Sequence, residues 1–166
     1  MDTPWVDGLT IGQVLSETAR RHESSDALVF PALGLKTSYA DFDRQVTEVA
    51  RGLLAVGIRR GEHVAIWSTN LPEWVLLQFA TARIGAVLVT VNTAYRPSEL
   101  AYVLAQSDAA ALFLIDRFKT SDYHAMLSEV CPELKASDGG EIGSEKFPQL
   151  RRVVELRDRP LDGALP

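Results

Sequence analysis

Residues 63–115, HVAIWSTNLPEWVLLQFATARIGAVLVTVNTAYRPSELAYVLAQSDAAALFLI, hold three apolar runs of strand length, HVAIW, VLVTV and ALFLI. The runs begin at residues 63, 87 and 111, so each starts 24 residues after the one before. Short apolar runs without alternation are typical of strands buried on both faces of a parallel sheet. Successive parallel strands need a crossover connection, and this interval leaves room for a helix in each. The stretch therefore predicts a repeated βαβ unit.

The two connecting segments have the sequence marks of helices. They are LPEWVLLQFATARIGA, residues 71–86, and PSELAYVLAQSD, residues 97–108. Each has a proline near its first turn and a glutamate just after it, and both residue types favour a helix N-terminus. The predicted fold class is α/β, with a βαβ-repeated, mainly parallel sheet flanked by helices.

The segments towards the N-terminus predict a covering helix and a pair of strands. Thr10 can cap a helix with apolar residues at helical spacing that ends in Arg20 and Arg21. The β-rich runs DALVF (26–30) and LKTSY (35–39) flank a turn with proline and glycine, which indicates a hairpin or two adjacent strands.

A long amphipathic helix is expected from Asp41 to Gly57, where the glycine provides a C-terminal stop. Its apolar residues follow each other in steps of four and three, which places them in one stripe. They are Phe42, Val46, Val49, Leu53 and Val56.

Periodicity fades towards the C-terminus. SDYHAMLSEVCPEL (121–134) predicts a helix that stops at Pro132, and LRRVVEL (150–156) returns to strand character. Between them, the Gly- and Ser-rich residues 135–145 are expected to form a mobile loop. We expect residues 1–166 to form one domain, because a chain of this size buries roughly 70% of its unfolded surface.

The composition excludes several classes of function. The formal charge is −5, from 17 basic and 22 acidic residues without long single-sign runs, so no nucleic-acid partner is expected. The three histidines and one cysteine are not arranged as metal ligands, and GxGxxG, GxxxxGK[ST] and GxSxG motifs are absent. No window approaches the roughly 20 apolar residues of a transmembrane helix. A single cysteine favours a reducing compartment, so the expected location is cytoplasmic, with peripheral contact at membranes as the alternative.

The fold class itself points to a candidate site. Ligands of parallel α/β sheets gather beyond the carboxyl ends of the strands, which places residues 68–70 and 92–96 on that rim. Arg96 lies between a strand end and a helix N-terminus, where free N–H groups and the helix dipole favour an anion. The structural alternative is a solvated arginine.

Taken together, residues 35–115 are similar to the N-terminal part of the AMP-forming acyl-CoA synthetases, within the adenylate-forming superfamily. TSYADF (37–42) and TARIGAVLVTVN (81–92) resemble two conserved segments of that family. VNTAYRPSELAYVLAQSDA (91–109) is typical of its fatty-acyl branch, and HAMLSEVCPEL (124–134) resembles the medium-chain enzymes. The resemblance covers nearly the entire chain and implies part of the large N-terminal domain of an adenylate-forming enzyme.

The resemblance implies an activity and its cofactors. Such enzymes use ATP and Mg²⁺ to convert a carboxylic acid to an acyl-adenylate, and then transfer the acyl group to CoA. The Gly-rich lysine loop that cradles the triphosphate and the lysine of the C-terminal domain lie downstream in the family. The chain is therefore expected to be a truncated front third, inactive alone and without tight cofactor binding. No catalytic residue carries over. A basic residue near the CoA phosphates in some relatives matches either Arg96 or the position of Ala94.

Two other functions are open from the sequence. A non-enzymatic interaction module would expose apolar surface that the rest of a synthetase would otherwise cover, and it could self-associate through that surface. A self-contained flavodoxin-like nucleotide binder would rest only on the βαβ period and the rim. The missing phosphate loop places this last reading behind the others.

Overall fold

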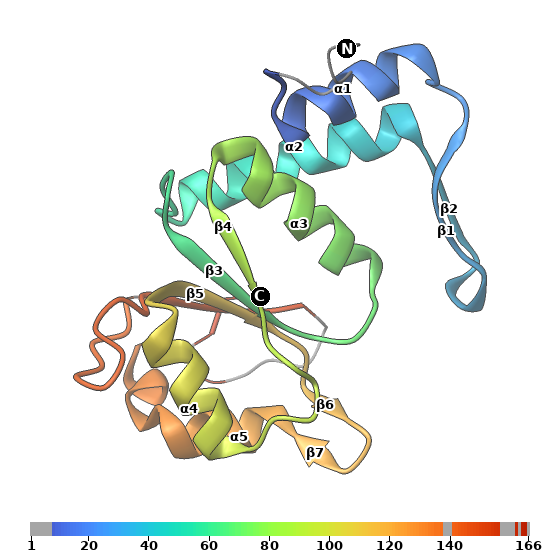
Figure 1. The fold of residues 1–166 in the computed structure, drawn as a ribbon. Helices are drawn as coiled ribbons and strands as arrows, with labels where there is room; N and C mark the ends of the chain where they lie inside the picture. The colour runs from blue at the N-terminus through green and yellow to red at the C-terminus, as the bar shows by residue number, and fades with distance from the viewer. Residues whose placement is uncertain (1–7, 138–140, 157–161, 163, 166) are drawn as a thin grey trace, which may run out of the picture. The chain divides into compact units, whose positions relative to one another are not determined.

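A computed structural model describes residues 8–137, 141–156, 162 and 164–165 (Figure 1). The chain divides into two compact units. The first, here called the helical unit, consists of residues Met1–Arg60 and Pro72–Ala86. The second, the sheet unit, consists of Gly61–Leu71 and Val87–Pro166. Each unit is therefore built from two separate stretches of sequence.

The helical unit contains three helices and a small hairpin. In chain order its elements are α1 (Ile11–Arg21), β1 (Asp26–Phe30), the 3-10 turn η1 (Pro31–Leu33), β2 (Leu35–Ser38), α2 (Tyr39–Ala55) and α3 (Pro72–Ile84). Thr10 caps α1 as predicted, because its side chain accepts from the N–H of Gln13 while the Gln13 side chain accepts from the N–H of Thr10.

Strands β1 and β2 pair antiparallel, which confirms the hairpin reading. The turn between them ends at Gly34, whose φ of 61° lies in the left-handed region that favours glycine. Val29 and Leu33 remain more than half exposed on this hairpin.

Helix α2 begins at Tyr39, two residues before the predicted start at Asp41. The reason is that Ser38 accepts the N–H of Asp41 and so becomes the N-cap, which places Asp41 in the first turn. The predicted stripe is confirmed at Phe42, Val46 and Leu53, all buried. Gly57 follows the helix with a φ of 90°, as expected of a glycine stop.

The sheet unit confirms the α/β prediction. Its elements are β3 (His63–Trp67), β4 (Val87–Thr90), α4 (Pro97–Gln106), β5 (Ala109–Leu114), β6 (Arg117–Phe118), β7 (Ser121–Asp122), α5 (Tyr123–Val130), the 3-10 turn η2 (Pro132–Ala136) and β8 (Arg152–Glu155). The main sheet has the order β4-β3-β5-β8, and all of its neighbouring strands are parallel. Helices α4 and α5 pack together on one face of it (Figure 1).

Burial follows position in the sheet. Every residue of the inner strand β5 is buried, and Val64 to Trp67 of β3 are buried as well. Val87, on the edge strand β4, is 46% exposed. Strand β5 begins at Ala109, two residues before the predicted run, because Ala109 already pairs with His63 of β3; the register then shifts at Ala110 before Ala111 pairs with Val64.

The C-terminal part has features that the sequence pattern did not predict. Strands β6 and β7 form a short antiparallel hairpin before α5, and Leu165 makes a parallel bridge to Val154 of β8. Of the loop predicted at 135–145, residues 138–140 lie outside the described residues, whereas Ile142 and Ser144 are buried. The mobility of this loop stays a prediction.

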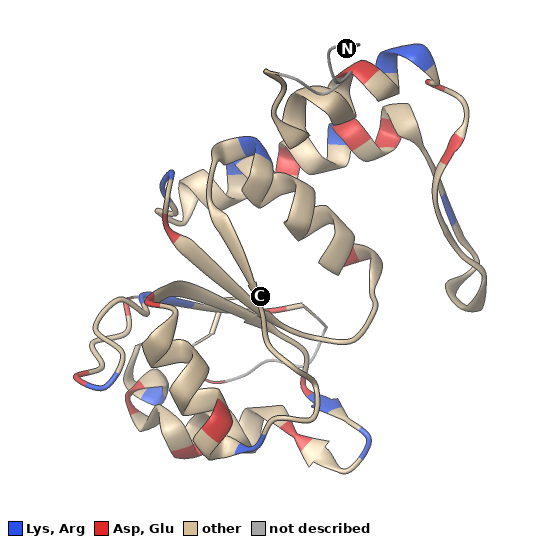
Figure 2. Cartoon of the chain, in the orientation of Figure 1, with Lys and Arg blue, Asp and Glu red and all other residues tan. Residues whose placement is uncertain are grey.

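Charged residues are spread over both units, and the helices are short. Figure 2 shows basic and acidic residues interspersed along the elements of both units. Among the residues that the structure describes, no helix is both long enough and apolar enough to cross a membrane.

Candidate functional site

The candidate site is the rim at the carboxyl ends of β3 and β4. Strand β3 ends at Trp67, whose side chain is fully buried, and its indole Nε1 donates to the backbone oxygen of Asn92 at 3.1 Å. The N–H of Val91 donates to the oxygen of Ile66, which extends the β3–β4 ladder one step further. The start of the 92–96 turn is therefore held directly against the end of β3.

Tyr123 supports the same turn from α5. Its ring stacks on Trp67 with 3.7 Å between centroids and 9° between planes, and its hydroxyl donates to the oxygen of Thr93 at 2.8 Å. Burial raises the pKa of Tyr123 to about 12. The phenol therefore stays protonated at neutral pH and acts as a permanent donor to the turn.

Within the turn, an amide group shapes the backbone. The side-chain oxygen of Asn92 accepts the N–H of Ala94 at 2.9 Å, two residues on. Asparagine commonly fixes turns in this way. The exposed Ala94 has no polar side chain and its N–H is already bonded, so it has no donor left for an anion.

Arg96 is exposed at the start of α4. Its backbone N–H donates to the Glu99 carboxylate at 2.9 Å, so this helix end is partly capped from within. One guanidinium nitrogen donates to the hydroxyl of Ser121 at 3.2 Å. No carboxylate in the described part of the chain forms an ion pair with Arg96. Since a guanidinium has five N–H donors, most of its donors remain available to an anion.

The other predicted rim segment, residues 68–70, does not join this arrangement. The hydroxyl of Ser68 donates to the backbone oxygen of Thr69, and no hydrogen bond joins either residue to the 92–96 turn in the described structure. The site is completed instead by Ser121 and Tyr123, which sequence reasoning missed. No local signal could have found them, because they reach the turn from 25 and 30 residues away.

A second polar pair lies at the end of β8. His124 of α5 contacts the carboxylate of Glu155 through Nε2, and the Glu155 side chain is only 2% exposed. Across the described residues, no three His, Cys, Asp or Glu side chains come together as a metal site would require. The pair therefore ties α5 to β8 and does not indicate a metal centre.

Cys131 is the remaining group with nucleophilic chemistry. It is fully buried, and burial, with the carboxylate of Glu133 nearby, raises the pKa of its thiol to about 11. A thiol with such a pKa is protonated at neutral pH and is a poor nucleophile.

Comparison with known proteins adds family information to this geometry. The family model described as AMP-binding enzyme matches residues 15–157. YngI of Bacillus subtilis (strain 168), assigned by its name to the acyl-CoA synthetases, is 44% identical over 154 residues, which cover 93% of this chain and 28% of YngI. The mitochondrial medium-chain acyl-CoA ligase ACSF2 of Rattus norvegicus is 39% identical over 156 residues, which cover 94% of this chain and 25% of the ligase.

A solved structure shows the same fold. The anthranilate CoA ligase AuaEII, determined with anthranoyl-AMP, superposes with a TM-score of 0.73 at 20% identity. The superposition covers 95% of this chain and 26% of that protein. The chain thus spans about a quarter of the length of the relatives it matches.

Proposed function

Because the chain belongs to the AMP-binding enzyme family, we propose that it forms the N-terminal part of an AMP-forming acyl-CoA synthetase. In the proposed activity, a medium- or long-chain fatty acid attacks ATP to give an acyl-adenylate and pyrophosphate. The thiol of CoA then displaces AMP to give the thioester. The observation that carries this proposal is the family match over residues 15–157, supported by two relatives named for acyl-CoA chemistry.

Of the three cofactors of the proposed reaction, ATP, Mg²⁺ and CoA, the described residues fit only CoA. An arginine with free N–H donors, beside a strand end, fits a phosphate group such as those of CoA. For Mg²⁺ and the triphosphate of ATP, the described residues offer no acidic cluster, and the sequence has no Gly-rich lysine loop. These residues do not fit Mg-ATP, and we propose that the chain alone is inactive.

Within this function, Arg96 is the proposed contact to a CoA phosphate. Its guanidinium is exposed and unpaired with any described carboxylate, whereas Ala94 has no donor to offer. Ser121 would steady the guanidinium, and Tyr123 with Trp67 would hold the turn in place.

A chimera tests the proposed function. This chain would replace the matching segment of the rat medium-chain ligase, and octanoate-dependent release of AMP and formation of octanoyl-CoA would be measured. A folded chimera should form the thioester, and the 166-residue chain alone should show no acid-dependent ATP–pyrophosphate exchange. A folded but inactive chimera would contradict the synthetase assignment. Exchange by the chain alone would contradict its inactivity.

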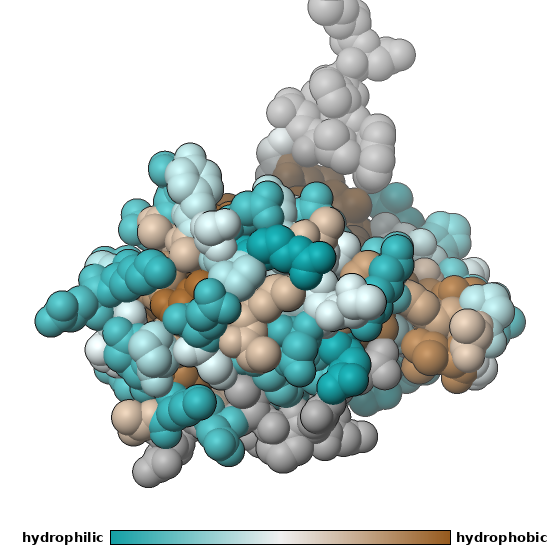
Figure 3. Space-filling model, turned by 90° about the horizontal axis from the view of Figure 1, so that it is seen from below, coloured by the Kyte–Doolittle hydropathy of each residue, from teal (hydrophilic) through white to brown (hydrophobic). Residues whose placement is uncertain are grey.

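A non-enzymatic interaction module is the second candidate. It is supported by large apolar side chains that stay more than half exposed, namely Ile11, Val29, Leu33, Leu54 and Tyr102. Figure 3 shows hydrophobic side chains, in brown, among hydrophilic ones on the face drawn. Self-association at micromolar concentration in sedimentation velocity would favour this function, and a monomer would count against it. The single cysteine supports a cytoplasmic location for either function.

A further inference from the structure

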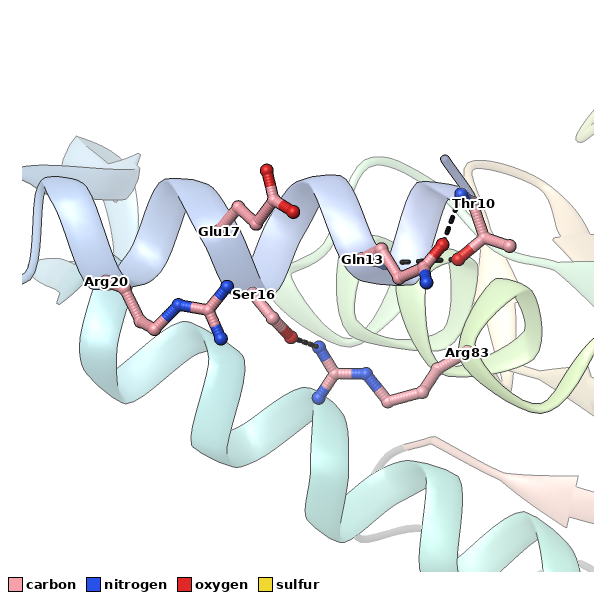
Figure 4. Close-up of a pocket in the computed structure, with 7 residues that line it drawn as sticks. Thr10, Gln13, Ser16, Glu17, Arg20 and Arg83 are labelled. Carbon is pink, nitrogen blue, oxygen red and sulfur yellow. Dashed lines mark hydrogen bonds between the residues drawn. The ribbon is translucent and has the colours of Figure 1, made fainter. Parts of the chain in front are cut away.

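A polar pocket of about 440 Å³ lies between α1 and α3 of the helical unit (Figure 4). It is here called the α1–α3 pocket. Its lining residues are Thr10, Gly12, Gln13, Ser16, Glu17 and Arg20 at or beside α1, and Arg83 of α3. A volume of this size is in the range of small-molecule sites. None of these residues belongs to the 92–96 turn, so a ligand of this pocket would bind at a site separate from that turn.

Arg83 forms the fixed wall of the pocket. Its guanidinium donates to the Asp43 carboxylate at 2.5 Å and to the Ser16 hydroxyl at 3.1 Å, and its side chain is only 18% exposed. The charge of Arg83 is therefore balanced by Asp43, and the Ser16 hydroxyl is occupied as well because it also donates to Asp43. These groups shape the pocket but have little left to offer a ligand.

Arg20 differs from Arg83 in having no partner among the described residues. Its side chain is exposed and makes no hydrogen bond or ion pair with any described residue. Figure 4 shows its guanidinium reaching along α1 towards Ser16. The neighbouring Arg21 forms the ion pair with Glu17, at 3.7 Å. Figure 4 shows the Glu17 carboxylate directed away from the guanidinium groups of Arg20 and Arg83.

Gln13 adds a second free donor group. Its side-chain oxygen accepts the N–H of Thr10 at 2.8 Å, which fixes the orientation of the amide. The amide nitrogen then has two N–H groups without an acceptor among the described residues. The Thr10 hydroxyl already accepts the N–H of Gln13. Apart from the carboxylate of Glu17, which pairs with Arg21 at 3.7 Å, the unspent groups of the pocket are donors, and they include the guanidinium of Arg20.

From this arrangement we propose that the α1–α3 pocket binds the oxyanion group, phosphate or carboxylate, of a small molecule, with Arg20 and the Gln13 amide as its donors. The planar guanidinium matches two oxygens of such a group at once. The capping box that holds Gln13 in place keeps the amide oriented before the ligand arrives. The pocket is larger than the oxyanion alone, which leaves room for the group that carries it.

The proposal is tested by NMR titration of the 166-residue chain at constant ionic strength. Inorganic phosphate is the first probe and acetate the second, with chloride as the balancing anion. The expected result is a saturable shift of the Gln13 side-chain NH₂ and Arg20 Nε–H signals by at least one of the two probes. Saturation by phosphate alone assigns the phosphate class, and saturation by acetate alone assigns the carboxylate class. No saturable shift with either probe overturns the proposal.

A pair of variants separates a site from general attraction by charge. Arg20→Gln should weaken binding about tenfold or more, because a charge-assisted hydrogen bond is lost. Arg51→Gln removes the same charge from an exposed position of α2 outside the pocket, and should change the affinity less than about twofold. Equal losses in the two variants would overturn the assignment to Arg20. Both side chains are exposed, so the fold should tolerate either change.

Discussion

The junction of α1, α2 and α3 and the turn at residues 92–96 each hold one arginine, in opposite surroundings. Arg83 at the junction is largely buried and bonds to Ser16, Asp43 and Thr47, which come from two other helices. Arg96 at the turn is exposed and has one side-chain partner, Ser121. A buried arginine whose donors are bonded to neighbouring helices stabilises the fold. An exposed arginine with spare donors is available to a ligand.

The largest expected effect comes from removing Arg83. Arg83→Met should lower the free energy of unfolding by about 2–3 kcal/mol, because Asp43 is left partly buried without its partner. The midpoint and slope of urea denaturation measure this change. Arg96→Met is the matched control and should stay within about 0.5 kcal/mol. Equal losses would break the contrast between the two arginines.

A glycine pair sharpens the account of the junction. A Cβ on Gly12 would lie 3.3 Å from the Cα of Arg83, whereas a Cβ on Gly52 of α2 would meet nothing within 4 Å. Gly52→Ala should therefore stabilise the protein by about 0.5–1 kcal/mol through helix propensity. In Gly12→Ala the same gain should be offset by the close contact with Arg83, which costs about 1–2 kcal/mol, so the two variants should differ by about that amount. Thermal melting of the two variants provides the comparison, and equal stabilisation would show that α1 and α3 are not in close contact.

Tyr123 tests how firmly the 92–96 turn is held. Tyr123→Phe removes the hydrogen bond to Thr93 and should cost about 1 kcal/mol of stability. The folded pKa of Tyr123, about 12, is higher than the ordinary pKa of a tyrosine, 10.0, so the stability from its protonated form is fully present below pH 10. That contribution should be lost as the pH rises from 10 towards 12. Unfolding free energies of both proteins between pH 8 and 11 measure this, and an unchanged difference would contradict it.

The smallest effect on stability, and the most informative for ligand binding, is expected at Arg96. In the active chimera, Arg96→Ala should raise the KM for CoA by about fivefold to tenfold with kcat nearly unchanged, because one charged hydrogen bond to phosphate is lost. Arg117→Ala, a second exposed arginine of the sheet unit, is the control and should leave KM unchanged. An unchanged KM in Arg96→Ala would leave Arg96 as a solvated arginine.

Much of the fold follows from local pattern. The three apolar runs and their spacing predict β3, β4 and β5, and the caps at Thr10 and Gly57 predict where helices begin or end. Such signals are readable because hydrophobic periodicity and capping involve residues within one or two turns of each other. The same signals misplace the start of α2 by two residues, since Ser38 and Asp41 are both acceptable caps.

The candidate site was predictable only in part. The rule for parallel sheets placed Arg96 at the rim, but it also placed residues 68–70 there, and these do not join the turn. The partners that shape the rim, Trp67, Ser121 and Tyr123, reach it by contacts of 25 to 30 residues in sequence separation. Contacts at this range leave no local pattern.

The order of residues along the chain thus determined the α/β class, the caps and the resemblance to one enzyme family, because each depends on neighbours in sequence. Tertiary structure alone decided which arginine is paired and which is free. The sequence contexts of Arg20, Arg83 and Arg96 do not separate them, since pairing depends on what other elements place within about 3 Å of a guanidinium. Asp43 reaches Arg83 across 40 residues, and no carboxylate among the described residues reaches Arg20 or Arg96. Burial and partners supplied by the fold therefore separate a structural arginine from a candidate for binding.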